Sequence, residues 1–124
     1  MKSRWTAHKG VRIFIADFSN YGGDVAAVQA EADNIIQLLQ NEPPASVFSV
    51  THVDGTFANE QTMRAFMSLV PVTNKHIKKR CVVGVRGFRK HLLAGFTRIT
   101  GRAQFVICDT MEEAFDFLVK QENA

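Results

Sequence analysis

The sequence predicts an α/β domain with a mostly parallel, four- to five-stranded sheet and helices packed on it. Two observations carry this prediction. Short apolar runs typical of buried strands alternate with longer stretches in which apolar residues recur at helical spacing. The connections between them are short, and the alternation occurs four times, which favours successive strand–helix units in a largely parallel sheet.

The composition fits one globular domain. The chain has 124 residues, of which 46% are hydrophobic and 22% charged, and its formal net charge is +3. The length suits a single domain over residues 1–124, with a core from about residue 8 to about residue 119. No apolar run is long enough to cross a bilayer, and no apolar stretch follows the first basic residues as in a secretory signal. We therefore expect a cytoplasmic protein without an integral membrane segment.

The first strand–helix unit follows a predicted hairpin. Residues 11–16 form a near-continuous apolar run, as in a strand covered on both faces. Residues 5–7 are expected to pair with this strand in antiparallel fashion, across a turn at residues 8–10.

A loop at residues 19–23 then leads into the first helix. Its composition, Ser-Asn-Tyr-Gly-Gly, is typical of turns. Apolar residues at helical spacing follow over residues 25–39, with Asp24 at the start and Pro43 and Pro44 beyond the end. The spacing predicts an amphipathic helix.

The second unit combines a strand at residues 47–51 with a helix capped by Asn59. Met63, Phe66, Met67 and Val70 form the apolar face of this helix, and Pro71 falls near its end.

Two further units complete the predicted sheet. A strand at residues 81–86 precedes a helix at residues 88–99, which Gly101 ends. A strand at residues 104–108 precedes the last helix, which begins with the capping-box sequence at residues 110–113. Cys81 and Cys108 fall within these two strands, so we expect free, buried thiols rather than a disulfide.

Nine basic residues and no acidic ones lie between residues 75 and 102. They are Lys75, Lys78, Lys79, Arg80, Arg86, Arg89, Lys90, Arg98 and Arg102. A folded surface of one sign attracts a partner of the opposite sign, which favours a small anion or an acidic protein. Nucleic acid is not expected, because no exposed aromatic residues are interleaved with the basic ones.

Ligands of open parallel sheets usually bind beyond the carboxyl ends of the strands. Six residues near these ends form the predicted binding site: Asn20, Tyr21, Asp54, Thr56, Arg86 and Arg89. A glycine at position 87, followed by a helix amino end, would let the backbone and the two arginines hold a phosphate, carboxylate or sulfate.

Simpler interpretations of these residues remain open. The arginines also suit an exposed, solvated helix face, and the loop around Tyr21 also suits ordinary turn chemistry. The basic residues 75–80 precede a strand, so they are expected to form a loop at the opposite end of the sheet.

No complete catalytic or metal-binding motif is present, and we expect no cofactor. His52 and Asp54 lie two residues apart at a strand end and suit a general base, but no nucleophile with a suitable glycine context lies near them in the sequence. A polar strand end that holds its loop is the alternative. The histidines are scattered, without the spacing of a zinc site.

Several segments carry a resemblance to a known family. They are residues 17–20, 43–47, 53–56, 82–87, 96–102 and 109–114. Together they resemble small bacterial proteins grouped with STAS and Sec14-like domains, which are fold relatives of the anti-sigma-factor antagonists of sporulation. The resemblance implies an N-terminal hairpin followed by repeated strand–helix units, and a domain that binds rather than catalyses.

The resemblance also implies where a partner would bind. In the sporulation antagonists, a serine at the amino end of the second helix is phosphorylated, which switches off partner binding. The matching stretch here, residues 54–59, holds no serine, and Thr56 is its only hydroxyl. Sec14-type relatives hold lipids in an apolar pocket, so a lipid or acyl carrier is the second hypothesis. An exposed edge strand would also allow a homodimer.

Overall fold

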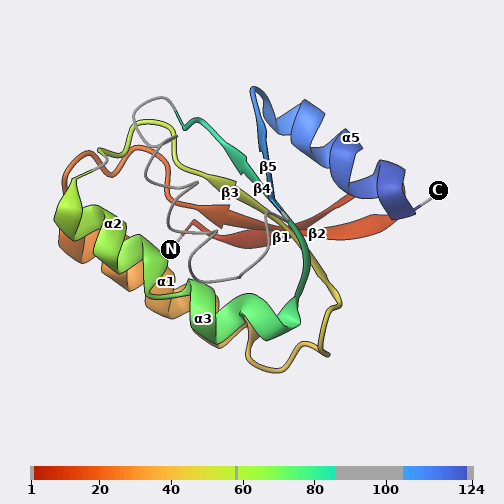
Figure 1. Ribbon diagram of the computed structural model, residues 1–124, viewed down its shortest axis with the longest axis horizontal. Coiled ribbons are helices and arrows are strands. Elements are labelled where there is room, and N and C mark those ends of the chain that lie inside the picture. Colours follow the sequence, from red (N-terminus) through yellow and green to blue (C-terminus); the bar gives the residue numbers. More distant parts are fainter. Residues whose placement is uncertain (1, 58, 86–104, 123–124) are drawn as a thin grey trace.

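The computed structural model describes residues 2–57, 59–85 and 105–122, and these form a single five-stranded mixed sheet (Figure 1). The strands are β1 (Arg4–His8), β2 (Val11–Asp17), β3 (Val47–His52), β4 (Ile77–Val83) and β5 (Phe105–Cys108). They lie in the order β1-β2-β3-β4-β5, with β1 antiparallel to β2 and the other pairs parallel. The predicted α/β class and the N-terminal hairpin are confirmed.

Helices cover both faces of the sheet. Helices α1 (Val25–Leu39), α2 (Glu60–Met67) and α3 (Val70–Thr73) lie on one side, and α5 (Met111–Glu122) lies on the other (Figure 1). A short 3₁₀ turn (Asn74–His76) joins α3 to β4. The described residues include no helix with both the length and the apolar character that a membrane span requires.

Strand β2 is apolar at nearly every position because helices cover both of its faces. Phe14 and Ala16 pack into the core beneath α1, α2 and α3, whereas Ile13 and Ile15 pack into the core beneath α5. Because successive side chains of a strand point to opposite faces, a strand covered on both sides is apolar at nearly every position.

Local signals place the turn and the helix starts where they were predicted. Lys9 and Gly10 have φ angles of 52° and 81°, as a two-residue hairpin turn of matching twist requires. Asp24 accepts a backbone N–H from the first turn of α1 at 3.0 Å. Asn59 and Thr62 cap α2 reciprocally, through hydrogen bonds of 2.9 and 3.1 Å.

The second predicted helix is interrupted. It was expected to run from the Asn59 cap through Val70, but α2 ends at Met67 and α3 begins at Val70 with Pro71 in its first turn. Proline lacks an N–H and its ring clashes with the carbonyl four residues earlier, so a continuous helix across this position is disfavoured.

Strand β4 begins earlier than predicted and ends earlier too. The sequence predicted a strand at residues 81–86 and a basic loop before it, but β4 runs from Ile77 to Val83. The basic residues 78–80 therefore lie in the strand, where Arg80 is buried and donates to Thr73 Oγ1 at 3.4 Å. Pairing with β3 extends the strand, because the parallel ladder supplies partners from Ile77 onward.

Both cysteines are buried and free, as expected. Burial raises the pKa of the Cys81 thiol, which keeps it protonated. The predicted helix at residues 88–99, with its glycine stop at residue 101, lies outside the described residues.

Candidate functional site

Two loops at the carboxyl ends of β2 and β3 form the rim of the sheet (residues 18–23 and 53–57). Backbone hydrogen bonds join them as if the strands continued. The N–H of Asn20 donates to Asp54 O at 2.8 Å, that of Gly22 to Gly55 O at 2.9 Å, and that of Phe57 to Gly22 O at 2.7 Å. Loops tied in this way hold a fixed shape, which a recognition surface requires.

Two glycines allow close contacts at the rim. Gly55 lies against the first loop, and Gly84, beyond β4, lies against the second. Gly55 has a φ of 79°, and a Cβ atom there would lie 2.4 Å from Asn20 Oδ1. Gly84, just beyond β4, has a φ of 84°, and its Cβ would lie 2.7 Å from the backbone nitrogen of Asp54. Both positions need the absence of a side chain and a left-handed backbone.

The structure brings four of the six predicted site residues together. Asn20, Tyr21, Asp54 and Thr56 all lie on the rim, and Asn20 and Asp54 are exposed to solvent. Arg86 and Arg89 lie outside the described residues.

Tyr21 and Thr56 are used inside the protein. The Thr56 side chain is buried, its hydroxyl donates to the Phe18 carbonyl, and it accepts the Tyr21 N–H at 3.1 Å. The Tyr21 hydroxyl donates to Glu31 Oε1 at 2.5 Å. These two residues therefore shape the rim instead of presenting free polar groups.

Phe57 is the rim residue that the sequence analysis missed. Its side chain is 65% exposed, the highest value among the large apolar residues that the structure describes. Its N–H bonds to Gly22 O, and its carbonyl accepts the Thr62 hydroxyl at 2.5 Å. A phenylalanine between a strand end and a helix cap, in a polar loop, was the available sequence signal.

A cavity of about 240 Å³ opens at the carboxyl ends of β3, β4 and β5. The described residues that line it are His52, Asp54, Val83, Gly84, Asp109, Thr110 and Met111. His52 and Asp54 thus face one space, as their spacing suggested. In residues 2–57, 59–85 and 105–122, no group of three acidic, histidine or cysteine side chains is placed to hold a metal ion.

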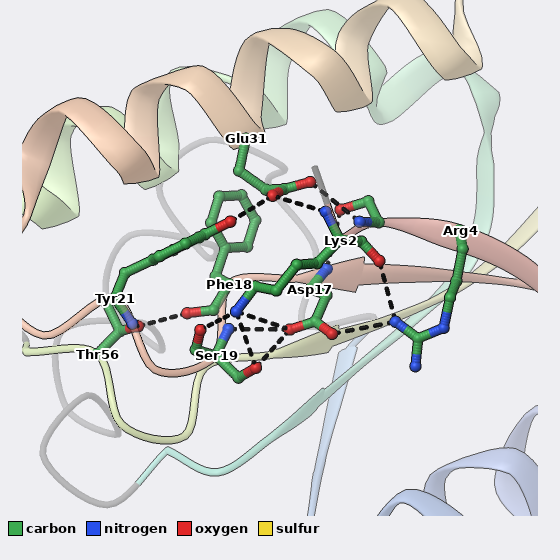
Figure 2. A network of polar contacts seen from close by, with 9 residues as sticks. Lys2, Arg4, Asp17, Phe18, Ser19, Tyr21, Glu31 and Thr56 are labelled. Carbon is green, nitrogen blue, oxygen red and sulfur yellow. Dashed lines mark hydrogen bonds and ion pairs between the residues drawn. The ribbon is translucent and has the colours of Figure 1, made fainter.

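Beneath the rim lies a buried polar network that includes Asp17 and Glu31 (Figure 2). Asp17, at the end of β2, accepts the Ser19 N–H at 3.0 Å, the Ser19 hydroxyl at 2.6 Å and the Arg4 guanidinium at 3.0 Å. Burial alone would raise the pKa of Asp17, but these hydrogen bonds outweigh it and lower the pKa.

Glu31, on α1, has no exposed surface. Its carboxylate accepts the Tyr21 hydroxyl, the Ser3 N–H at 3.0 Å and the Lys2 N–H at 3.2 Å. Burial again acts to raise the pKa of Glu31, and the three donors more than offset it, so the pKa is lowered. Burial and the Glu31 carboxylate both raise the pKa of Tyr21.

The segment of residues 2–4 completes this network. The Lys2 ammonium lies 4.1 Å from the centre of the Tyr21 ring, donates to the Ser19 carbonyl, and lies 3.7 Å from Asp17 Oδ1. Ser3 Oγ accepts the Asp17 N–H at 3.0 Å. Figure 2 shows Lys2 between Asp17 and Glu31 of α1, with Arg4 beside Asp17.

The sequence matches no protein-family model, and no curated protein is significantly similar to it.

Proposed function

We propose that this chain is a non-enzymatic, STAS-like binding module that recognises a protein partner through the rim, with Phe57 as the central contact. The exposed Phe57 side chain, held on a fixed backbone, is the observation that carries this proposal. An aromatic side chain of this kind contributes large contact area and loses little entropy on binding, and such residues dominate many protein interfaces.

The surroundings of Phe57 suit an interface. The side chains of Asn20 and Asp54 are exposed on the same two loops, so an apolar contact is bordered by polar groups. The resemblance to STAS domains supports the same surface, because the stretch 54–59 corresponds to the region that controls partner binding in the sporulation antagonists. The Thr56 hydroxyl is already bonded to the Phe18 carbonyl, so our proposal does not depend on its phosphorylation.

A small ligand in the cavity at the ends of β3, β4 and β5 is the second candidate. The cavity volume and the convergence of His52, Asp54 and Asp109 on it favour a small polar molecule. Four of the seven described residues in the lining carry polar side chains, which makes this part of the lining poorly suited to an acyl chain. An anion would depend on Arg86 and Arg89, because the described lining carries two carboxylates.

An enzyme that uses His52 and Asp54 is less well supported. The hydroxyl in the described lining belongs to Thr110, and it accepts the Glu113 N–H at 3.1 Å as the cap of α5. Among the residues that the structure describes, the cavity lining contains neither serine nor cysteine. A general base needs a hydroxyl or thiol that gives up its proton to it, or a positioned water.

Site-specific photo-crosslinking in cells tests the proposal. A benzophenone amino acid replaces Phe57 in one variant and Val72 in a control, since Val72 is 48% exposed on α3, near the opposite end of the strands. We expect a discrete crosslinked protein at position 57 and none at position 72. The same crosslinks at both positions, or none at position 57, would contradict the proposal.

Native mass spectrometry of the gently purified protein separates the second candidate from the first. A retained small molecule that is lost in Asp109→Ala supports a ligand in the cavity. A ligand-free protein that still crosslinks through position 57 supports the protein partner.

A further inference from the structure

The two loops of the rim are not the only segments that fix its shape. Glu31 accepts hydrogen bonds from two distant parts of the chain, namely the Tyr21 hydroxyl and the backbone N–H groups of Lys2 and Ser3. Burial of a carboxylate costs free energy unless hydrogen-bond donors surround it. The Glu31 charge therefore favours an arrangement in which all of these donors are in place together.

Tyr21 carries this constraint to the rim. Its hydroxyl is held by Glu31, and its backbone N–H donates to Thr56 Oγ1 at 3.1 Å. The residues on either side of it, Asn20 and Gly22, donate to the second rim loop. The Tyr21 side chain is therefore a direct link between α1 and the shape of the loop that carries Phe57.

Asp17 provides a second link to the same segment. It bonds to Ser19 at the start of the rim and to the Arg4 guanidinium, and its own N–H donates to Ser3. Lys2 adds the contact with the Tyr21 ring and with the Ser19 carbonyl. The residue 2–4 segment thus touches the first rim loop at Ser19 and Tyr21.

We propose that the residue 2–4 segment is a strap that holds the rim in shape in two ways: through Glu31, which acts as a positioning residue, and through the cations of Lys2 and Arg4. The coupling between the strap and the rim does not depend on what the rim binds. Only its significance for binding rests on the proposed function. Coupling of this kind is reciprocal. A partner that holds the rim tightens the strap, and a force or ligand that draws residues 2–4 away loosens the rim.

Amide hydrogen exchange on the full chain, followed residue by residue by NMR, tests the coupling without any partner. Two strap variants weaken the connection between strap and rim at different points. Tyr21→Phe removes the hydroxyl that joins the rim to Glu31, and Lys2→Ala/Arg4→Ala removes the cations that contact Ser19, Tyr21 and Asp17. The control, Arg64→Ala/Lys120→Ala, removes the same charge from two exposed helix positions. The informative amides are those of Asn20, Gly22 and Phe57, which close the rim.

We expect both strap variants to speed exchange at these three amides by roughly fivefold or more, as the loss of about one net hydrogen bond implies. The amides of β4 should keep their parent rates, and so should all amides of the control. Parent rates at the rim in Lys2→Ala/Arg4→Ala would overturn the coupling, whatever Tyr21→Phe does, because only the double variant changes the strap itself. An equal rise in β4 would also overturn it, because it would mean general destabilisation.

The outcome is separable from that of the proposed function. If position 57 finds no partner while the strap variants loosen the rim, the coupling stands and the binding proposal fails. If position 57 crosslinks and the rim amides do not respond to the strap, only the coupling fails.

Discussion

The Tyr21 hydroxyl donates a 2.5 Å hydrogen bond to the Glu31 carboxylate, and this contact ties the first rim loop to helix α1. Glu31 has no exposed surface, yet its pKa is lowered, because its donors outweigh the effect of burial. The first rim loop is thus held by an ionised carboxylate inside the domain. The stability of the rim should depend on that charge and on the chain segments that donate hydrogen bonds to it.

The free energy of unfolding should fall at acid pH as the two buried carboxylates, Asp17 and Glu31, become protonated. Their pKa values are lowered from ordinary values of 3.8 for Asp17 and 4.5 for Glu31. A group with a lowered folded-state pKa stabilises the fold fully above its unfolded pKa and ceases to do so as the pH falls through the folded one. We expect the parent to begin to lose its advantage over Glu31→Gln below about pH 4.5 and its advantage over Asp17→Asn below about pH 3.8.

Urea denaturation at a series of pH values measures this effect. At neutral pH each variant should lose about 1–3 kcal/mol of unfolding free energy, the usual cost of removing hydrogen bonds to a charged group. A difference between parent and variant that stays constant from pH 7 to pH 3 would rule out the assigned ionisation.

Gly84→Ala should destabilise the protein more than Gly10→Ala. Both glycines have positive φ angles, of 84° and 81°, so both substitutions carry backbone strain of about 1 kcal/mol. Only at Gly84 does the added Cβ also meet a neighbour, the backbone of Asp54, at 2.7 Å; nothing lies within 4 Å of it at Gly10. Chemical denaturation of the pair compares them directly, and equal losses would disprove the close approach at Gly84.

Neither thiol should react in the folded protein. Cys81 and Cys108 are buried, and burial raises both thiol pKa values, so little thiolate is present or accessible at neutral pH. A thiol-specific reagent such as DTNB should modify about two cysteines per chain in denaturant and close to none without it. Fast labelling under native conditions would contradict the packing of β4 and β5 against α5.

Phe57→Ala should leave stability nearly unchanged, because most of the side chain is in water. We expect a change within about 0.5 kcal/mol, as for other exposed positions. Phe18→Ala is the contrasting variant, since Phe18 is buried against Phe66 with ring centroids 5.0 Å apart, and should cost about 3–5 kcal/mol. A large loss of stability in Phe57→Ala would assign this residue to the core.

Local signals in the sequence predicted much of the fold. Positive-φ residues at the hairpin and side-chain caps such as Asp24 act over a few neighbours, so their consequences can be read without the tertiary structure. The early start of β4 could not be read in this way. The lysines and arginine of residues 78–80 look like a loop, and only the pairing with β3 places them in a strand.

The shared position of Asn20, Tyr21, Asp54 and Thr56 at one rim was predicted, but the directions of their side chains were not. Strand ends predicted that Asn20 and Asp54 would meet, since parallel strands end at one edge of the sheet. The Tyr21 side chain points inward because its hydroxyl bonds to Glu31. Glu31 lies on the same face of α1 as the buried residues Val28, Ala32 and Ile35, and helical spacing alone would place it there. The exposure of Phe57 is a tertiary property, because an apolar residue in a loop is equally compatible with the core.

The affinity of a partner captured through position 57 tests the central claim most directly. Isothermal titration calorimetry would compare the affinities of the parent, Phe57→Ala and the surface control Val72→Ala for this partner, under conditions in which all three proteins are folded. Our account predicts that Phe57→Ala weakens binding by at least about tenfold, as for a central aromatic contact, and that Val72→Ala binds like the parent. Equal affinities for all three proteins would contradict the assignment of the rim as the binding surface.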